Sequence, residues 1–179
     1  MKRTTLVALV VAAILPTAGQ TRAQQTQAQQ LQTCGPDKVA TAPDSRYLNH
    51  GDGTVTDITT GLMWKQCAEG LSGADCVSGA PMHFTREDAK KQPQGQTFAG
   101  HSDWRLPTHK ELLTLVEKRC YNPSINATLF PGTPTTGYWS STPGAFNADY
   151  TWIVAFGFGD LYYGSPSGPF TLRLVRDGK

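Results

Sequence analysis

The sequence predicts a disulfide-stabilised α+β domain with two helices and a small antiparallel sheet. Two short segments carry helix-start signals, several β-prone segments surround them, and four cysteines follow an N-terminus typical of exported proteins. After removal of the predicted signal, 156 residues remain, which is enough for one domain with one substantial core.

Residues 1–23 are interpreted as a secretory signal peptide. Lys2 and Arg3 precede an apolar run over 6–15, and small residues place a cleavage site near Ala23. The run is too short to span a membrane. We therefore expect a periplasmic or secreted protein without stable membrane insertion. Cleavage changes the formal net charge from +2 to −1, which gives no support for nucleic-acid binding.

Residues 24–45 are expected to form a disordered, glutamine-rich tether. Their first part, QQTQAQQLQT, has almost no apolar surface to bury. The folded domain is then expected to span residues 46–179.

Four cysteines remain in the exported chain: Cys34, Cys67, Cys76 and Cys120. Their even number and the oxidising compartment favour disulfides. Zinc is the less favoured alternative, because the closest cysteines are nine positions apart and form no CxxC pair. Three pairings are possible. We favour Cys67–Cys76, which closes a short loop, and Cys34–Cys120, which ties the N-terminal segment to the domain.

The domain begins with a predicted β-hairpin. Residues 54–57 and 62–65 are β-prone, and Thr59-Thr60-Gly61 supplies the turn. Residues 84–92 then predict a short helix with Thr85 as its N-cap, followed at the capping-box spacing by an aspartate.

A second helix is predicted to begin after Thr108. Glu111 follows at the capping-box spacing, and an apolar stripe continues the helical period. The helix is expected to reach Arg119, because Lys118 and Arg119 would complement the helix dipole in the last turn. Asn122-Pro123 would end it.

Strands are predicted for the rest of the chain. Residues 137–142 form one, and residues 150–164 form two around a turn near Gly159-Asp160. The first of these two alternates the apolar side chains Trp152, Val154, Phe156 and Phe158. Residues 170–177 predict a closing strand with its two leucines on one face.

No enzyme signature is present. Histidines 50, 83, 101 and 109 form neither an HExxH motif nor a helical i, i+4 pair. The GSPSG segment at 164–168 lacks the central serine of a GxSxG motif. We therefore expect a non-enzyme with no catalytic residues, no metal and no cofactor.

The segment before the second helix concentrates charged and aromatic side chains. One interpretation pairs His101 and Asp103 as acid and base, with Arg105 binding an anion. The favoured interpretation is a structural corner in which Trp104 enters the core. Because a buried arginine needs a partner, Asp103 is expected to pair with Arg105.

Five motifs together resemble the DUF1566 family, also called the Lcl C-terminal domain family after a collagen-like adhesin. In order they are DGTVTDITTGLMWKQC, FAGHSDWRLPTHKELLTLVE, NPSIN, FPGTPTTGYWSST and LRLVR. The resemblance covers residues 46–177. It implies a C-type-lectin-like fold, in the branch of the formylglycine-generating enzymes, and exported bacterial proteins that act in adhesion and glycan or glycosaminoglycan binding.

The resemblance also implies which residues form the framework: Trp64, Asp103, Trp104, Arg105, Trp139 and Arg173. The calcium-dependent sugar motifs Glu-Pro-Asn and Trp-Asn-Asp are absent from the sequence, and no cysteine follows residue 120 to support formylglycine-generating activity. Polyanion binding would require the basic residues to gather on one face: Lys118, Arg119, Arg173 and Arg176.

The ligand surface is expected on the irregular segments between residues 143 and 169. Tyrosines beside aspartate and asparagine suit sugar or peptide recognition, because rings stack while polar groups orient the ligand. The candidate residues are Phe146, Asn147, Asp149, Tyr150, Asp160, Tyr162 and Tyr163. The alternative is that these aromatic side chains complete the core or an oligomer interface.

We therefore expect an exported binding module that recognises a glycan or a protein ligand on a surface. The alternative is a structural or interaction subunit of the bacterial cell envelope. An enzyme related to the formylglycine-generating branch is the least favoured hypothesis, and the oligomeric state stays open.

Overall fold

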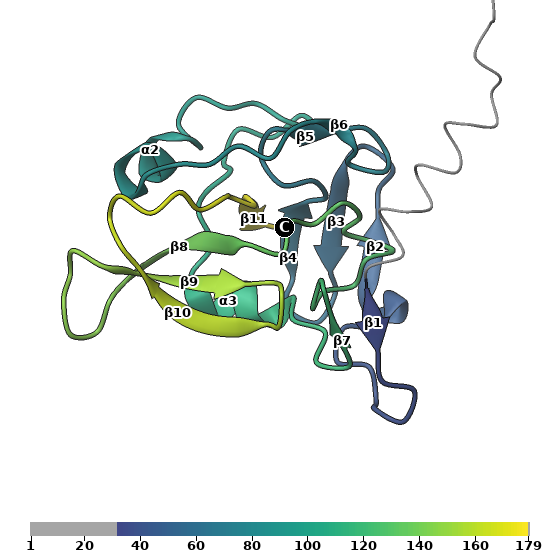
Figure 1. Ribbon diagram of the computed structural model, residues 1–179. Coiled ribbons are helices and arrows are strands. Elements are labelled where there is room, and N and C mark those ends of the chain that lie inside the picture. Colours follow the sequence, from purple (N-terminus) through teal and green to yellow (C-terminus); the bar gives the residue numbers. More distant parts are fainter. Residues whose placement is uncertain (1–31, 179) are drawn as a thin grey trace, which may run out of the picture.

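Two main antiparallel β-sheets, two smaller strand pairs and two short α-helices build residues 32–178, which the computed structural model describes (Figure 1). The predicted α+β class is confirmed, with two larger sheets in place of one. The predicted signal peptide, residues 1–23, and residues 24–31 of the predicted tether lie outside the described residues.

The four-stranded sheet has the order β11-β4-β3-β2. Its strands are β2 (Tyr47–Asn49), β3 (Thr54–Asp57), β4 (Leu62–Lys65) and β11 (Val175–Asp177). The predicted hairpin is confirmed, because β3 and β4 pair antiparallel within the expected bounds. Val55 faces Trp64 across the pair, and both are fully buried. Gly61 has a φ of 72°, which glycine adopts without steric cost.

The three-stranded sheet has the order β10-β9-β8. Its strands are β8 (Gly137–Pro143), β9 (Thr151–Ala155) and β10 (Asp160–Gly164), as predicted. The expected one-sided alternation of β9 is wrong. Ile153 and Val154 are both buried, because the sheet is covered on both faces, and Phe158 lies exposed in the following turn.

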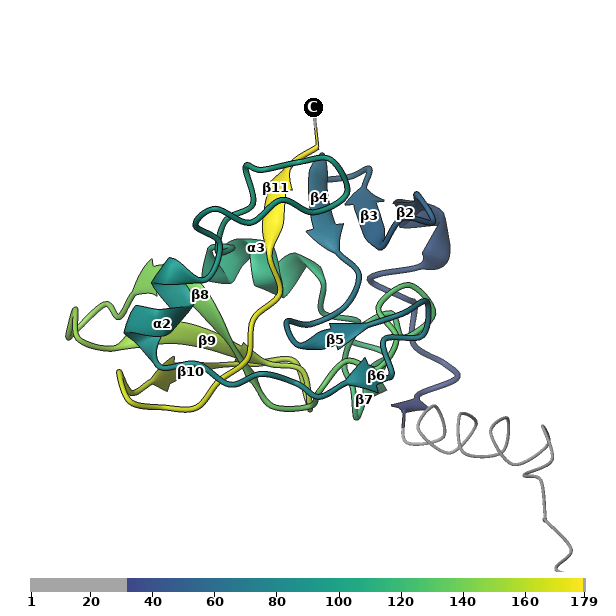
Figure 2. The same cartoon turned by 90° about the horizontal axis from the view of Figure 1, so that it is seen from above.

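The closing segment is strand only at its end, in β11, although a strand over 170–177 was expected. Thr171 bridges Tyr138 of β8, whereas Val175 pairs with Trp64 of β4. The segment therefore crosses from one main sheet to the other, as Figure 2 shows. Because neighbours cover it on all sides, residues 171–176 are buried without alternation.

The two helices are α2 (Arg86–Lys91) and α3 (His109–Thr114). Both predicted helix starts are confirmed. The Thr85 hydroxyl accepts a hydrogen bond from the backbone N–H of Asp88. At α3, Thr108 accepts from the backbone N–H of Glu111, and the Glu111 carboxylate accepts from the backbone N–H of Thr108. These reciprocal bonds form the expected capping box.

Helix α3 ends at Thr114, so the expected extension to Arg119 is wrong. The backbone N–H of Glu117 donates to the carbonyl of Ser124 instead of continuing the helical ladder. Lys118 and Arg119 consequently lie beyond the helix. The spacing of apolar residues in the sequence continues past the end of the helix, because the residues of the following turn are also buried.

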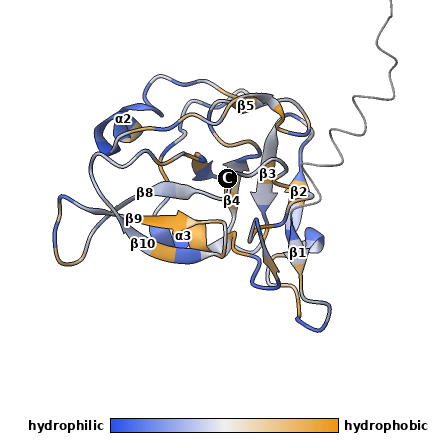
Figure 3. Cartoon of the chain, in the orientation of Figure 1, coloured by the Kyte–Doolittle hydropathy of each residue, from blue (hydrophilic) through white to orange (hydrophobic). Residues whose placement is uncertain are grey.

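The core has two clusters that share the strands of both sheets. Trp64 and Val154 belong to the cluster that also holds Leu112, the buried leucine of α3. Met63 and Ile153, their chain neighbours, belong to the cluster around Trp139. Because successive strand residues point to opposite faces, β4 and β9 contribute to both clusters. Figure 3 shows β9 as strongly hydrophobic.

Both predicted disulfides are present, Cys34–Cys120 and Cys67–Cys76. The two small strand pairs are β1 (Thr33–Cys34) with β7 (Cys120–Tyr121), and β5 (Leu71–Ser72) with β6 (Ser78–Gly79). Each disulfide therefore secures a region with little regular structure.

The N-terminal segment is held against the domain from Gln32 onward. The Gln32 amide donates at 2.7 Å to two backbone carbonyls, those of Pro123 and Ile125, and a 3₁₀ turn, η1 (Asp44–Arg46), follows β1 along the chain. The predicted boundary at residue 46 therefore comes too late, since residues 32–45 are part of the fold.

Glu117 connects this segment to the end of α3. Its carboxylate accepts hydrogen bonds from the backbone N–H groups of Thr41, Ala42 and Arg119 at 2.8–3.1 Å. Burial alone would raise the pKa of Glu117, but the bonds from Ala42, Arg119 and Thr41 outweigh it and hold the pKa below its ordinary value.

Glu117→Gln is expected to lower the free energy of unfolding by about 1–3 kcal/mol at neutral pH, because the amide has one acceptor oxygen and no charge. The folded-state pKa of Glu117 is lowered, so its stabilisation is complete above the unfolded pKa and is lost as the pH falls through the folded pKa. Urea unfolding of both proteins from neutral to strongly acidic pH tests this. A difference that does not shrink in acid would contradict it.

Candidate functional site

The corner before α3 belongs to the framework. Trp104 is 4% exposed, and its indole N–H donates to the carbonyl of Phe98 at 3.1 Å. Asp103 accepts from Arg176 at 2.7 Å, so the predicted Asp103–Arg105 pair is wrong. Asp103 and Arg176 are 73 positions apart, so local spacing could not reveal this pair.

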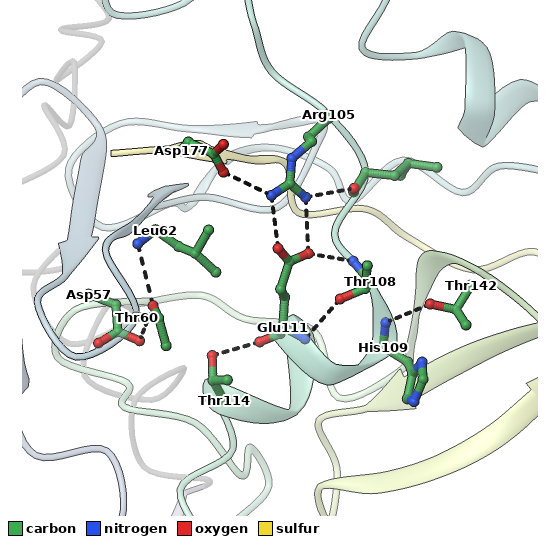
Figure 4. A network of polar contacts seen from close by, with 11 residues as sticks. Asp57, Thr60, Leu62, Arg105, Thr108, His109, Glu111, Thr114, Thr142 and Asp177 are labelled. Atoms are coloured by element: carbon green, nitrogen blue, oxygen red, sulfur yellow. Dashed lines mark hydrogen bonds and ion pairs between the residues drawn. The ribbon is translucent and has the colours of Figure 1, made fainter. Parts of the chain in front are cut away.

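Arg105 has other partners (Figure 4). It donates to both carboxylate oxygens of Glu111, at 2.8 and 3.0 Å, and to Asp177 at 3.2 Å. Burial alone would raise the pKa of Glu111, but Arg105 and the backbone N–H of Thr108 hold the pKa below its ordinary value. Arg105 therefore joins the start of α3 to β11.

Arg173 is fully buried and fixes the closing segment to the end of β4. It donates to the backbone carbonyls of Lys65 and Gln66 and, at 2.8 Å, to the hydroxyl of Thr133. Its guanidinium lies 4.9 Å from the ring centroid of Phe130. Burial lowers the pKa of Arg173.

The loop between β8 and β9, residues 144–150, carries several predicted ligand residues and projects from the molecule in Figure 1. The backbone N–H of Asp149 donates to the Asn147 side chain at 2.9 Å. Arg86, on α2, donates to the carbonyls of Ala148 and Asp149 at 2.8 and 2.6 Å. These bonds fix the loop in place.

Four aromatic side chains follow one another in space beside this loop, and we call them the aromatic row. Tyr163 stacks on Trp152, with ring centroids 3.9 Å apart and planes 27° apart. Phe146 lies edge-on to Tyr163, at 6.4 Å. On the other side, His109 lies 5.8 Å from Trp152. The row thus joins α3, two strands and the loop.

An apolar hollow of about 290 Å³ opens at the end of this row and is called the aromatic hollow. It is lined by Phe146, Asn147, Tyr150 and Tyr163. Phe146 is 94% exposed, and Tyr150 and Tyr163 are each 40% exposed. The alternative that these aromatic side chains complete the core is therefore wrong.

The seven predicted ligand residues do not form one surface. In β10, Tyr163 is opposite Trp152, whereas Tyr162 is opposite Ile153, which faces the core cluster around Trp139. Successive strand residues point to opposite faces. Tyr162 therefore lies away from the aromatic hollow, together with Asp160, to which its hydroxyl donates at 3.1 Å.

Two members of the aromatic row, Trp152 and His109, were not predicted as site residues. The sequence pattern places Trp152 in an apolar stripe, and only its pairing with Tyr163 places it in the row. Burial and then Lys110 lower the pKa of His109. The Nδ1 atom of His109 is buried and has no hydrogen-bond partner within the described residues.

The charges around the aromatic hollow argue against a polyanion site. Its lining residues carry no formal charge. Arg173 and Arg176 are 0% and 7% exposed, so they cannot join Lys118 and Arg119 in the basic face considered above.

Within residues 32–178, no group of three or more His, Cys, Asp or Glu side chains is placed to hold a metal ion. No helix in this part of the chain is long and apolar enough to span a membrane.

The geometry defines a disulfide-stabilised α+β domain that exposes aromatic side chains at one end of its three-stranded sheet. The family model described as the Lcl C-terminal domain matches residues 53–176, and the chain belongs to this family. No curated protein matches the sequence.

Proposed function

We propose that the protein is an exported, non-enzymatic binding module whose aromatic hollow recognises a glycan. The observation that supports this proposal is the exposure of Phe146, Tyr150 and Tyr163 around the hollow. Hydrogen bonds from α2 hold the loop that borders the hollow in place. Large exposed apolar side chains on a fixed loop are typical of a ligand surface.

The lining offers the chemistry that a sugar requires. Aromatic rings stack on the C–H faces of sugars, and tyrosine restricts few rotatable bonds when it binds. The Asn147 side-chain oxygen accepts from Asp149, which leaves its NH₂ group to donate to a ligand. The uncharged lining favours neutral glycans over glycosaminoglycans.

The proposal includes export and a C-type-lectin-like fold. The two disulfides support an oxidising compartment, the periplasm or the exterior. The sheets and disulfides are compatible with the lectin-like arrangement that the family resemblance implies. Because the sequence lacks the calcium-dependent sugar motifs, we propose binding without calcium.

A structural or interaction subunit of the cell envelope is the second candidate. At the β9–β10 turn, Phe158 stacks on Tyr121 with centroids 6.1 Å apart, and these side chains are 68% and 43% exposed. This turn is at the opposite end of β9 from the aromatic hollow. A second exposed aromatic pair favours contact with a protein partner.

A glycan array probed with the oxidised protein tests the proposal. We expect hits among neutral glycans that persist when calcium is chelated. A folded protein that binds no glycan would contradict glycan recognition. A pull-down from envelope extracts, with Phe158→Ala as the comparison, would then test the second candidate.

A further inference from the structure

A second, larger hollow lies beside the loop that the Cys67–Cys76 disulfide closes. It has a volume of about 500 Å³ and is called the disulfide-loop hollow. Its lining includes Asp52, Gly53, Lys65, Gln66, Glu69 and Phe98. None of these residues belongs to the aromatic row or to the aromatic hollow.

Gln66 is the unusual residue of this hollow. It is 7% exposed, and its backbone is fixed, since its N–H donates to Gly53 at 2.8 Å and its carbonyl accepts from Arg173. Gln66 lines the hollow, and among the described residues none forms a hydrogen bond with its side-chain amide. An amide that no protein group pairs is available to exchange hydrogen bonds with a ligand.

Two charged side chains of the wall, Lys65 and Glu69, neutralise each other. The Lys65 ammonium donates to Glu69 at 2.9 Å and to Gln96 at 2.7 Å, and lies 4.7 Å from the ring centroid of Phe98. The Lys65 and Glu69 side chains are about one-tenth exposed. With Asp52 at the rim, the local charge is negative, which disfavours anionic ligands.

The hollow is preformed because its loop cannot relax freely. A Cβ atom at Gly70 would lie 2.3 Å from the carbonyl oxygen of Ala80, so the two backbones are in close contact. The disulfide and the β5–β6 pair close the same loop. A preformed pocket loses less entropy when it binds.

We propose that the disulfide-loop hollow binds a small, neutral, amide-bearing sugar of the N-acetylhexosamine class. The Gln66 amide can exchange two hydrogen bonds with an acetamido group, and the Glu69 carboxylate can accept from a sugar hydroxyl. The apolar side chains of Leu71 and Phe98 supply contacts for the acetyl methyl and the ring. The volume exceeds that of one sugar ring, so the site suits a terminal residue of a longer chain.

The test is a titration of ¹⁵N-labelled, oxidised protein with N-acetylglucosamine, followed by NMR, with glucose as the ligand control. We expect saturable shifts at the Gln66 side-chain amide and at the backbone amides of 66–74, and little response to glucose. Gln66→Leu is expected to weaken binding about tenfold, the effect of one or two lost hydrogen bonds.

Tyr163→Ala, in the aromatic hollow, is expected to leave this titration unchanged, so failure of the two sites can be distinguished. Shifts that are absent from 66–74, or equal for glucose and N-acetylglucosamine, would overturn the proposal. The unsubstituted protein gives this answer by itself, whether or not Gln66→Leu folds.

Discussion

Replacing both Cys34 and Cys120 by serine is expected to lower the free energy of unfolding by about 4.5 kcal/mol, because an 86-residue separation is no longer closed in the unfolded chain. The bond also anchors β1, which within residues 32–178 pairs only with the two residues of β7. Without it, the segment that contacts Glu117 is expected to detach before the sheets unfold.

The matched control is Cys67→Ser with Cys76→Ser. Its separation is 9 residues, so the same loop model predicts a loss of about 2.5 kcal/mol. Urea unfolding of the three oxidised proteins measures both differences. Equal losses, or a larger loss for the shorter loop, would show that loop closure does not govern the effect.

Trp139→Ala is expected to lower the free energy of unfolding by about 3–5 kcal/mol, the range for a large aromatic side chain removed from a core. Trp139 is fully buried, its indole N–H donates to the Phe84 carbonyl at 2.8 Å, and its ring lies edge-on to Phe170 at 5.0 Å. The substitution would leave a cavity and an unpaired carbonyl where the closing segment crosses β8.

Trp152→Ala is the control, since Trp152 is in the neighbouring strand but only partly buried. We expect it to cost much less stability, because water fills the space that the ring leaves. Thermal or urea unfolding compares the two variants. A Trp152→Ala loss as large as that of Trp139→Ala would contradict the assignment of the aromatic row to the surface.

Local sequence signals predicted the hairpin, both helix starts and three strands of the second sheet. These elements depend on neighbours within a few positions, such as Thr108 with Glu111 or Gly61 in its turn. The predicted end of α3 was wrong because Glu117 forms hydrogen bonds with Ser124 and with residues 41 and 42. The helical period of the sequence contains no information about these contacts.

Partners across the fold could not be predicted in the same way. Asp103 pairs with Arg176, and Arg105 with Glu111 and Asp177, although Asp103 and Arg105 are closer to each other in sequence. Strand alternation could have separated Tyr162 from Tyr163 once β10 was predicted. Trp152 could not have been added without the register of β9 against β10.

The paired variants Tyr163→Ala and Tyr162→Ala test the central claim most directly, because the two tyrosines are neighbours on opposite faces of β10. The measurement is the binding of each folded variant to the neutral glycans on the array. Tyr163→Ala is expected to weaken binding at least about tenfold, and Tyr162→Ala to leave it nearly unchanged. Equal losses, or a loss confined to Tyr162→Ala, would contradict recognition at the aromatic hollow.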